Sequence, residues 1–142
     1  MSLGTFLEIS LHENIKNMKQ FFTLVTIGAL ISSFTVFSSI DEVIAGMNKG
    51  NSTEIAIFFD NTVEINMPDK SNSYSKSQGE LVLKDFFNSN SVKAFEIIHK
   101  GENSGSQYCI GTLLTKNGSF RTTIYMKKKG DKQVLQGITF EK

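Results

Sequence analysis

The sequence predicts an α+β domain over residues 40–142, with helices packed on one face of a mostly antiparallel sheet. Two observations support this class. In the first half of the domain, apolar residues recur at helical spacing behind helix-start signals. From Val92 onward they recur at every second residue, and turn signals separate the runs. The expected order is therefore helix, helix, strand, helix and then a four-stranded meander.

Two short helices in tandem are expected first. Ser39 and Glu42 have the spacing of a capping box, which predicts a helix over residues 39–49 that ends at Gly50. Asn51 or Ser52 then provides the N-cap of a second helix, which we expect to extend as far as Phe59.

A strand and a third helix follow. Residues 62–67 alternate between apolar and polar side chains, which is typical of a half-buried strand, and Pro68 ends it. The polar stretch 69–75 is expected to be a loop. Ser75 and Gln78 form a second capping box, which predicts that the third helix begins there.

Four strands complete the domain. Asn117-Gly118 and Gly130-Asp131 are two-residue turn signals of the kind that join antiparallel strands, and residues 101–106 form a looser connection. The expected strands are 92–99, 107–116, 119–128 and 132–141.

The hairpins predict which side chains share a face. A turn at Asn117-Gly118 pairs Thr115 with Phe120 and Leu113 with Thr122. One face then carries Cys109, Leu113, Phe120, Ile124 and Met126, and the other carries Tyr108, Ile110, Leu114, Arg121 and Tyr125. A bulge in the last hairpin would decide which face receives Val134, Ile138 and Phe140. Because neither face is wholly polar, we expect a homodimer or the N-terminal segment to cover the face without helices.

The N-terminal region has the features of an export signal. Residues 21–40 contain no charge, and the short basic segment 18–20 precedes them. Small residues near Ser38 and Ser39 predict cleavage there, which makes residues 1–39 a leader with an upstream extension. We therefore expect a periplasmic or secreted protein. A retained membrane anchor and a buried helix are the alternatives, because the length of the run suits all three.

Charge and composition exclude several classes of function. Without the leader, 13 basic and 12 acidic residues remain, which argues against a nucleic-acid-binding surface. The basic run Lys127–Lys129 is expected to be a solvated hairpin end. Cys109 is the only cysteine, so it is expected to fill the core. Two histidines and one cysteine predict no metal site, and no motif indicates a cofactor.

No constellation of catalytic residues is recognisable. Arg121 lies mid-strand among apolar neighbours, where it needs a carboxylate partner or an anionic ligand. His99 ends a strand and could act in acid-base chemistry or lie at the surface. Tyrosine hydroxyls could point into a pocket or into water. The candidate ligand-binding residues are Tyr74, His99, Tyr108, Arg121 and Tyr125.

Three stretches carry a resemblance to a known family. They are NSYSKSQGELVLKDFF (72–87), HKGENSGSQYCIGTL (99–113) and NGSFRTTIYMKKKG (117–130). They resemble a family of small exported bacterial domains of unknown function. The resemblance implies a nuclear transport factor two-like fold, in which a curved sheet and helices form a cone, and it implies no activity.

Two functions from different classes remain. The first is a non-catalytic module that binds a small ligand or a protein, with a pocket between the third helix and the sheet. The second is an isomerase-like or hydratase-like enzyme, which would need Asp60, Glu64 or Glu96 inside a polar cone. A cone filled by Phe58, Phe86 and Phe87 would argue against the second.

Overall fold

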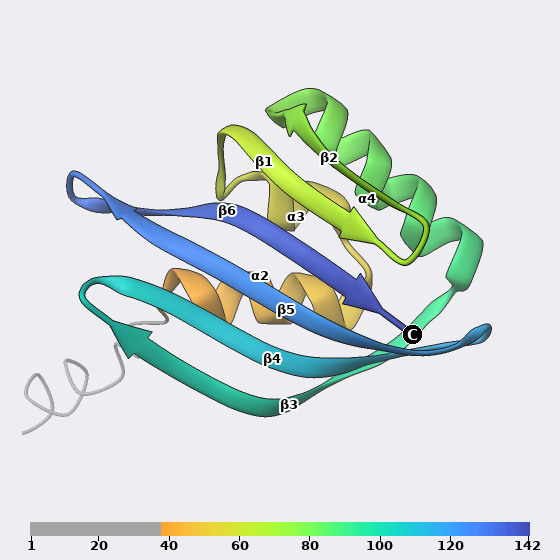
Figure 1. Cartoon of the computed structure of the whole chain (residues 1–142). Helices are drawn as coiled ribbons and strands as arrows, with labels where there is room; N and C mark the ends of the chain where they lie inside the picture. Colours follow the sequence, from red (N-terminus) through yellow and green to blue (C-terminus); the bar gives the residue numbers. More distant parts are fainter. Residues whose placement is uncertain (1–37) are drawn as a thin grey trace, which may run out of the picture. The chain divides into compact units, whose positions relative to one another are not determined.

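A computed structural model describes residues 38–142, and the expected leader, its cleavage and its alternative roles lie outside them. This part of the chain contains three helices and six strands. Figure 1 shows how they are arranged. The helices are α2 (Ser39–Lys49), α3 (Ser52–Ala56) and α4 (Lys76–Asn90). The strands are β1 (Phe59–Met67), β2 (Lys70–Ser75), β3 (Val92–Asn103), β4 (Ser106–Thr115), β5 (Gly118–Lys129) and β6 (Lys132–Glu141).

The strands form one sheet in the order β2-β1-β6-β5-β4-β3. The predicted meander β3 to β6 is confirmed, and each of its hairpins is antiparallel. The first strand, β1, lies beside the last, β6, and this pair is parallel. The three helices pack on one face of the sheet and leave the other without a helix, as Figure 1 shows. We call the face that the helices cover the inner face, and the opposite face the outer face.

The helix starts were predicted well, with one error. The N-cap of α2 is Ser38, one residue before the predicted Ser39, and Asp41 completes its capping box. The hydroxyl of Ser38 lies 2.7 Å from the Asp41 carboxylate. For α4 the predicted box of Ser75 and Gln78 is confirmed.

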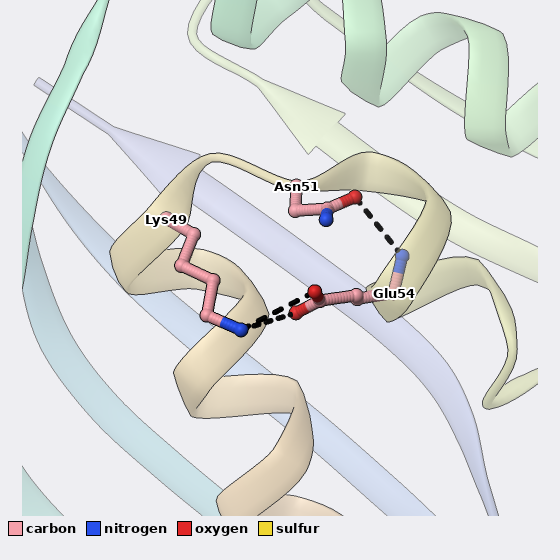
Figure 2. A network of polar contacts seen from close by, with 3 residues as sticks. All are labelled: Lys49, Asn51 and Glu54. Carbon is pink, nitrogen blue, oxygen red and sulfur yellow. Dashed lines mark hydrogen bonds and ion pairs between the residues drawn. The ribbon is translucent and has the colours of Figure 1, made fainter.

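The joint between α2 and α3 shows why the first helix stops where it does. Gly50 adopts the left-handed conformation (φ 63°) that favours glycine after a helix. The backbone N–H of Glu54 then donates to the side chain of Asn51 at 3.2 Å. Lys49 reaches both carboxylate oxygens of Glu54, at 3.0 and 3.2 Å (Figure 2). The second helix is shorter than predicted, since Phe59 already belongs to β1.

The core lies between the inner face and the helices. Cys109, Leu113, Phe120, Ile124 and Met126 are all buried, which confirms the predicted inner face. The register within the hairpin was wrong by two residues, because Thr115 pairs with Gly118 and Leu113 with Phe120. A shift of two leaves every side chain on its predicted face.

A bulge in β6 decides which side chains of the last strand face the core. Met126 pairs with Leu135 and Tyr125 with Gly137, so Gln136 is the extra residue. Ile138 and Phe140 consequently reach the inner face and are buried. Val134 lies opposite Lys127, on the other side of the bulge.

The predicted loop 69–75 is wrong, since most of it forms strand β2. Met67 pairs with Lys70, so Pro68-Asp69 is a two-residue turn between antiparallel strands. Five of the six residues of β2 are exposed, and no apolar alternation marks it. A polar edge strand with a lysine discourages pairing with other chains, and this composition is also what made it look like a loop.

Candidate binding hollow on the outer face

One row of residues crosses the outer face of the sheet. In this row Gly101 pairs with Tyr108, Tyr108 with Tyr125, and Tyr125 with Gly137. Gly137 in turn pairs with Glu64 on β1. The row therefore contains two tyrosines, each paired with a glycine. Tyr108 lies opposite Gly101 of β3, and Tyr125 lies opposite Gly137 of β6.

The first glycine in the row is covered. A Cβ added to Gly101 would lie 2.6 to 2.8 Å from the hydroxyl and ring atoms of Tyr108. The same hydroxyl lies 2.9 Å from Nε2 of His99. The ring of Tyr108 therefore leans across Gly101 and closes this end of the row.

The second glycine is bare. A Cβ added to Gly137 would meet only the carbonyl oxygen and Cβ of Glu64, at 3.7 and 3.9 Å. The hydroxyl of Tyr125 donates to the Ser106 hydroxyl at 3.2 Å, so this ring leans toward β4 and away from Gly137. Since both tyrosines lean toward β3, the last glycine of the row has no ring above it.

A hollow of about 410 Å³ lies at this point. The sheet is irregular on both sides of it, because Gln136 bulges from β6 and β1 shifts register against β6 between Phe59 and Glu64. Bulges of this kind re-aim side chains and are common near functional sites. The lining residues are Thr62, Val63, Glu64, Asn66, Ser73, Thr123, Tyr125, Gln136, Gly137 and Thr139.

The floor of the hollow holds a small hydrogen-bond network. The amide nitrogen of Asn66 donates to Glu64 at 3.0 Å and to the Thr139 hydroxyl at 3.2 Å. The Asn66 amide oxygen is buried and has no hydrogen-bond partner within residues 38–142. An unpaired buried acceptor costs about 1–3 kcal/mol, so a donor from outside the chain would stabilise it.

Two lysine–carboxylate pairs lie outside this row. Lys129 donates to Asp60 at 2.7 Å and, with the backbone N–H of Asn61, lowers the pKa of the Asp60 carboxyl. Lys100 pairs with Asp41 of α2 at 2.6 Å and, together with the Ser38 hydroxyl, lowers the pKa of that carboxyl.

The five predicted site residues do not form one site. Tyr125 lines the hollow, whereas His99 and Tyr108 lie together at the covered end of the row. Tyr74 lies on the other face, where it packs against the core. Arg121 is exposed on the outer face and forms no ion pair with a described carboxylate, so the first of its two expected partners is not found in residues 38–142. Only one of the five therefore contributes to the hollow.

The predicted pocket between the third helix and the sheet corresponds to a groove of about 480 Å³ at the end of α4. None of the five candidates lines it. Phe86 lies there, with its ring centroid 4.4 Å from that of the tilted Phe140 ring and 5.2 Å from that of Phe120, which meets it edge-on. Phe58 and Phe86 pack against the core and Phe87 is buried in it. All three phenylalanines therefore contribute to the packed interior of the domain.

The three carboxylates that the enzyme hypothesis names do not share one site. Asp60 pairs with Lys129, Glu64 lies in the outer hollow, and Glu96 is exposed. Residues 38–142 contain no group of three or more potential metal ligands. Cys109 is buried and free, as predicted, and burial raises the pKa of its thiol.

Sequence reasoning missed most of the hollow. Gly137 and Gln136 carried no visible signal, because the bulge that places them depends on the pairing of β6 with both neighbours. The alternation in residues 62–67 did place Glu64 and Asn66 together on the polar face of β1, but nothing in it predicted a hollow there.

Comparison with known proteins identifies the family. The family described as Domain of unknown function (DUF4783) matches residues 40–141. The chain belongs to this family. A DUF4783 protein from Bacteroides fragilis is 32% identical, with 71% of this chain and 95% of that chain covered and a TM-score of 0.67. For one from Bacteroides ovatus the identity is 29%, the coverage 71% and 92%, and the TM-score 0.69.

More distant structures define the fold. An NTF2-like protein of unknown function from Cytophaga hutchinsonii has a TM-score of 0.55 at 9% identity, over 72% of this chain and 84% of that chain. The DUF4783 chain therefore has the nuclear transport factor two-like fold that its sequence predicted. No curated protein matches it. Within the described residues, none of the helices combines the length and the apolar character of a membrane span.

Proposed function

We propose that this DUF4783 protein is an exported, non-catalytic module that binds a small ligand in the outer-face hollow. The observation that carries the proposal is the uncovered Gly137. A side chain at this position would meet no close contact, yet glycine keeps the floor open beside an exposed tyrosine ring. The volume of about 410 Å³ lies within the range of small-molecule sites.

A thermal-shift screen with a small-fragment collection tests this proposal. A fragment that raises the Tm of the wild-type protein should not do so in Gly137→Leu, because the new side chain occupies the hollow. The matched control is Tyr108→Ala, which removes a ring from the same row outside the lining and should leave the shift intact. Equal shifts in the wild type and Gly137→Leu would contradict the proposal.

The apolar part of the outer face supports a homodimer. Ile110 and Leu114 on β4 are half-buried side chains on the face without helices. A second copy seated over β3 and β4 would cover them and leave the hollow between β5, β6 and β1 open. Analytical ultracentrifugation should show dimers for the wild type and monomers for Ile110→Lys. Monomers in both would contradict the dimer.

The uncharged run 21–40 supports export. Ser38, one of the two expected cleavage positions, is the N-cap of α2, so cleavage after Ser38 or Ser39 would remove the cap from the mature domain. Loss of such a cap costs about 1 kcal/mol. The intact mass of the protein recovered from the periplasm or medium would show the new N-terminus, and a mass that retains residues 1–37 would contradict cleavage.

A further inference from the structure

We infer that the ligand of the outer-face hollow is a neutral polyhydroxylated molecule, that is, a saccharide. The inference rests on the proposed function, because it names the chemical class that this same hollow recognises.

The charges of the lining favour a neutral ligand. None of the lining residues is a lysine, arginine or histidine, so an anion would find no cationic partner among them. Glu64 is the only carboxylate, and one of its oxygens already accepts a hydrogen bond from Asn66. A single exposed carboxylate next to hydroxyl groups is weak support for a cation, but it accepts hydrogen bonds from neutral hydroxyls well.

The polar groups of the lining suit hydroxyl partners. Five residues present hydroxyls, each of which both donates and accepts, and two present amides, which combine a donor with an acceptor. They are Thr62, Ser73, Thr123, Tyr125 and Thr139, with Asn66 and Gln136. Sugar hydroxyls have the same two-way capacity, whereas an apolar ligand would leave these groups without partners.

The remaining features suit the ring of a sugar. Tyr125 is 42% exposed and lines the hollow, and its ring leans toward β4 and leaves the floor at Gly137 bare. The C–H face of a pyranose is flat and apolar and packs well on an aromatic ring that keeps its hydroxyl wet. The Tyr125 ring and the bare Gly137 therefore suit the apolar C–H face of a saccharide, and the hydroxyls and amides of the lining suit its hydroxyl groups.

Saturation-transfer NMR and titration calorimetry on the full chain test the inference. The probes are glucose, galactose, mannose, N-acetylglucosamine, maltose and cellobiose, and the comparison probes are phosphate, benzoate and choline. At least one saccharide should bind the wild type. Its affinity should fall about tenfold or more in Gly137→Leu and in Tyr125→Ala. In Tyr108→Ala it should stay within about twofold, since that ring lies outside the lining.

The outcomes separate the two proposals. If benzoate, phosphate or choline binds in a manner that Gly137→Leu abolishes, and no saccharide does, the saccharide inference is overturned and the hollow remains a binding site. If a saccharide binds equally well to Gly137→Leu and to the wild type, both the inference and the proposed site are overturned. If no probe of either set binds, the saccharide inference is overturned, and the fragment screen alone decides the proposed function.

Discussion

The two ends of one row in the sheet contain the same pair of residues in opposite surroundings. At one end the Tyr108 ring lies over Gly101, within 2.8 Å of where a Cβ would stand. At the other end Tyr125 turns toward Ser106 and leaves Gly137 open. The difference teaches that a glycine opposite an aromatic residue is not by itself a packing device, because the direction of the ring decides whether the site is filled or vacant.

The largest loss of stability in this comparison is expected at Gly111, a glycine of the inner face that neighbouring atoms cover. A Cβ added to Gly111 would collide with the Phe95 ring and lie 2.6 Å from the carbonyl oxygen of Glu96. Backbone cannot move aside, so Gly111→Ala should lower the free energy of unfolding by about 3 kcal/mol. Urea denaturation measures this change in the free energy of unfolding. A loss under about 1 kcal/mol would show that ring cover does not restrict a glycine in this sheet.

Gly101→Ala should have a smaller cost. The clashing atoms belong to the end of the Tyr108 side chain, which can swing out at the expense of its contact with His99. We expect a loss of about 1 kcal/mol in the same denaturation experiment. Tyr108→Ala combined with Gly101→Ala should cost no more than Tyr108→Ala alone, since the double variant has no clash. An additive cost would show that the Tyr108 ring is not the source of the stability lost in Gly101→Ala.

Gly137→Ala should be neutral or stabilising. The added methyl meets only ordinary contacts, and alanine restricts the unfolded chain more than glycine does. The expected gain is about 0.5 kcal/mol, visible as a small rise in the urea midpoint. A loss comparable to that of Gly101→Ala would mean that the hollow is closed in solution, which would remove the contrast between the two ends.

The Lys100–Asp41 and Lys129–Asp60 ion pairs should give the smallest effect. The pKa values of Asp41 and Asp60 are lowered in the folded protein, chiefly by hydrogen bonds from Lys100 and Lys129. Their contributions to stability are therefore present above the unfolded pKa, 3.8 for each carboxyl, and are lost as the pH falls through the lower folded values.

Denaturation at neutral pH and at about pH 3 measures this dependence. Lys100→Met and Lys129→Met should each lose less stability on acidification than the wild type does, and both changes should be small because the pairs are exposed. A wild-type dependence that neither variant reduces would contradict the assignment of the lowered pKa values to these lysines.

Local signals in the sequence determined much of the fold. The capping box at Ser75, the N-cap at Asn51 and the left-handed Gly50 each act within a few residues, so they could be recognised without knowing the rest of the structure. The alternation from Val92 onward likewise predicted four strands and the inner face of β4 and β5. The register error at Thr115 did no harm there, because a shift of two residues preserves the face.

Only the tertiary structure decided the edge strand and the hollow. The polar β2 exists because β1 offers it backbone partners, and its side chains contribute little. The floor at Gly137 depends on a bulge in β6, on a register shift against β1 and on the direction of Tyr125. The sequence by itself determined the elements, since caps, turns and alternation are local. Pairing between distant strands determined the site, because the side chains that line it come from four strands that meet only in the folded sheet.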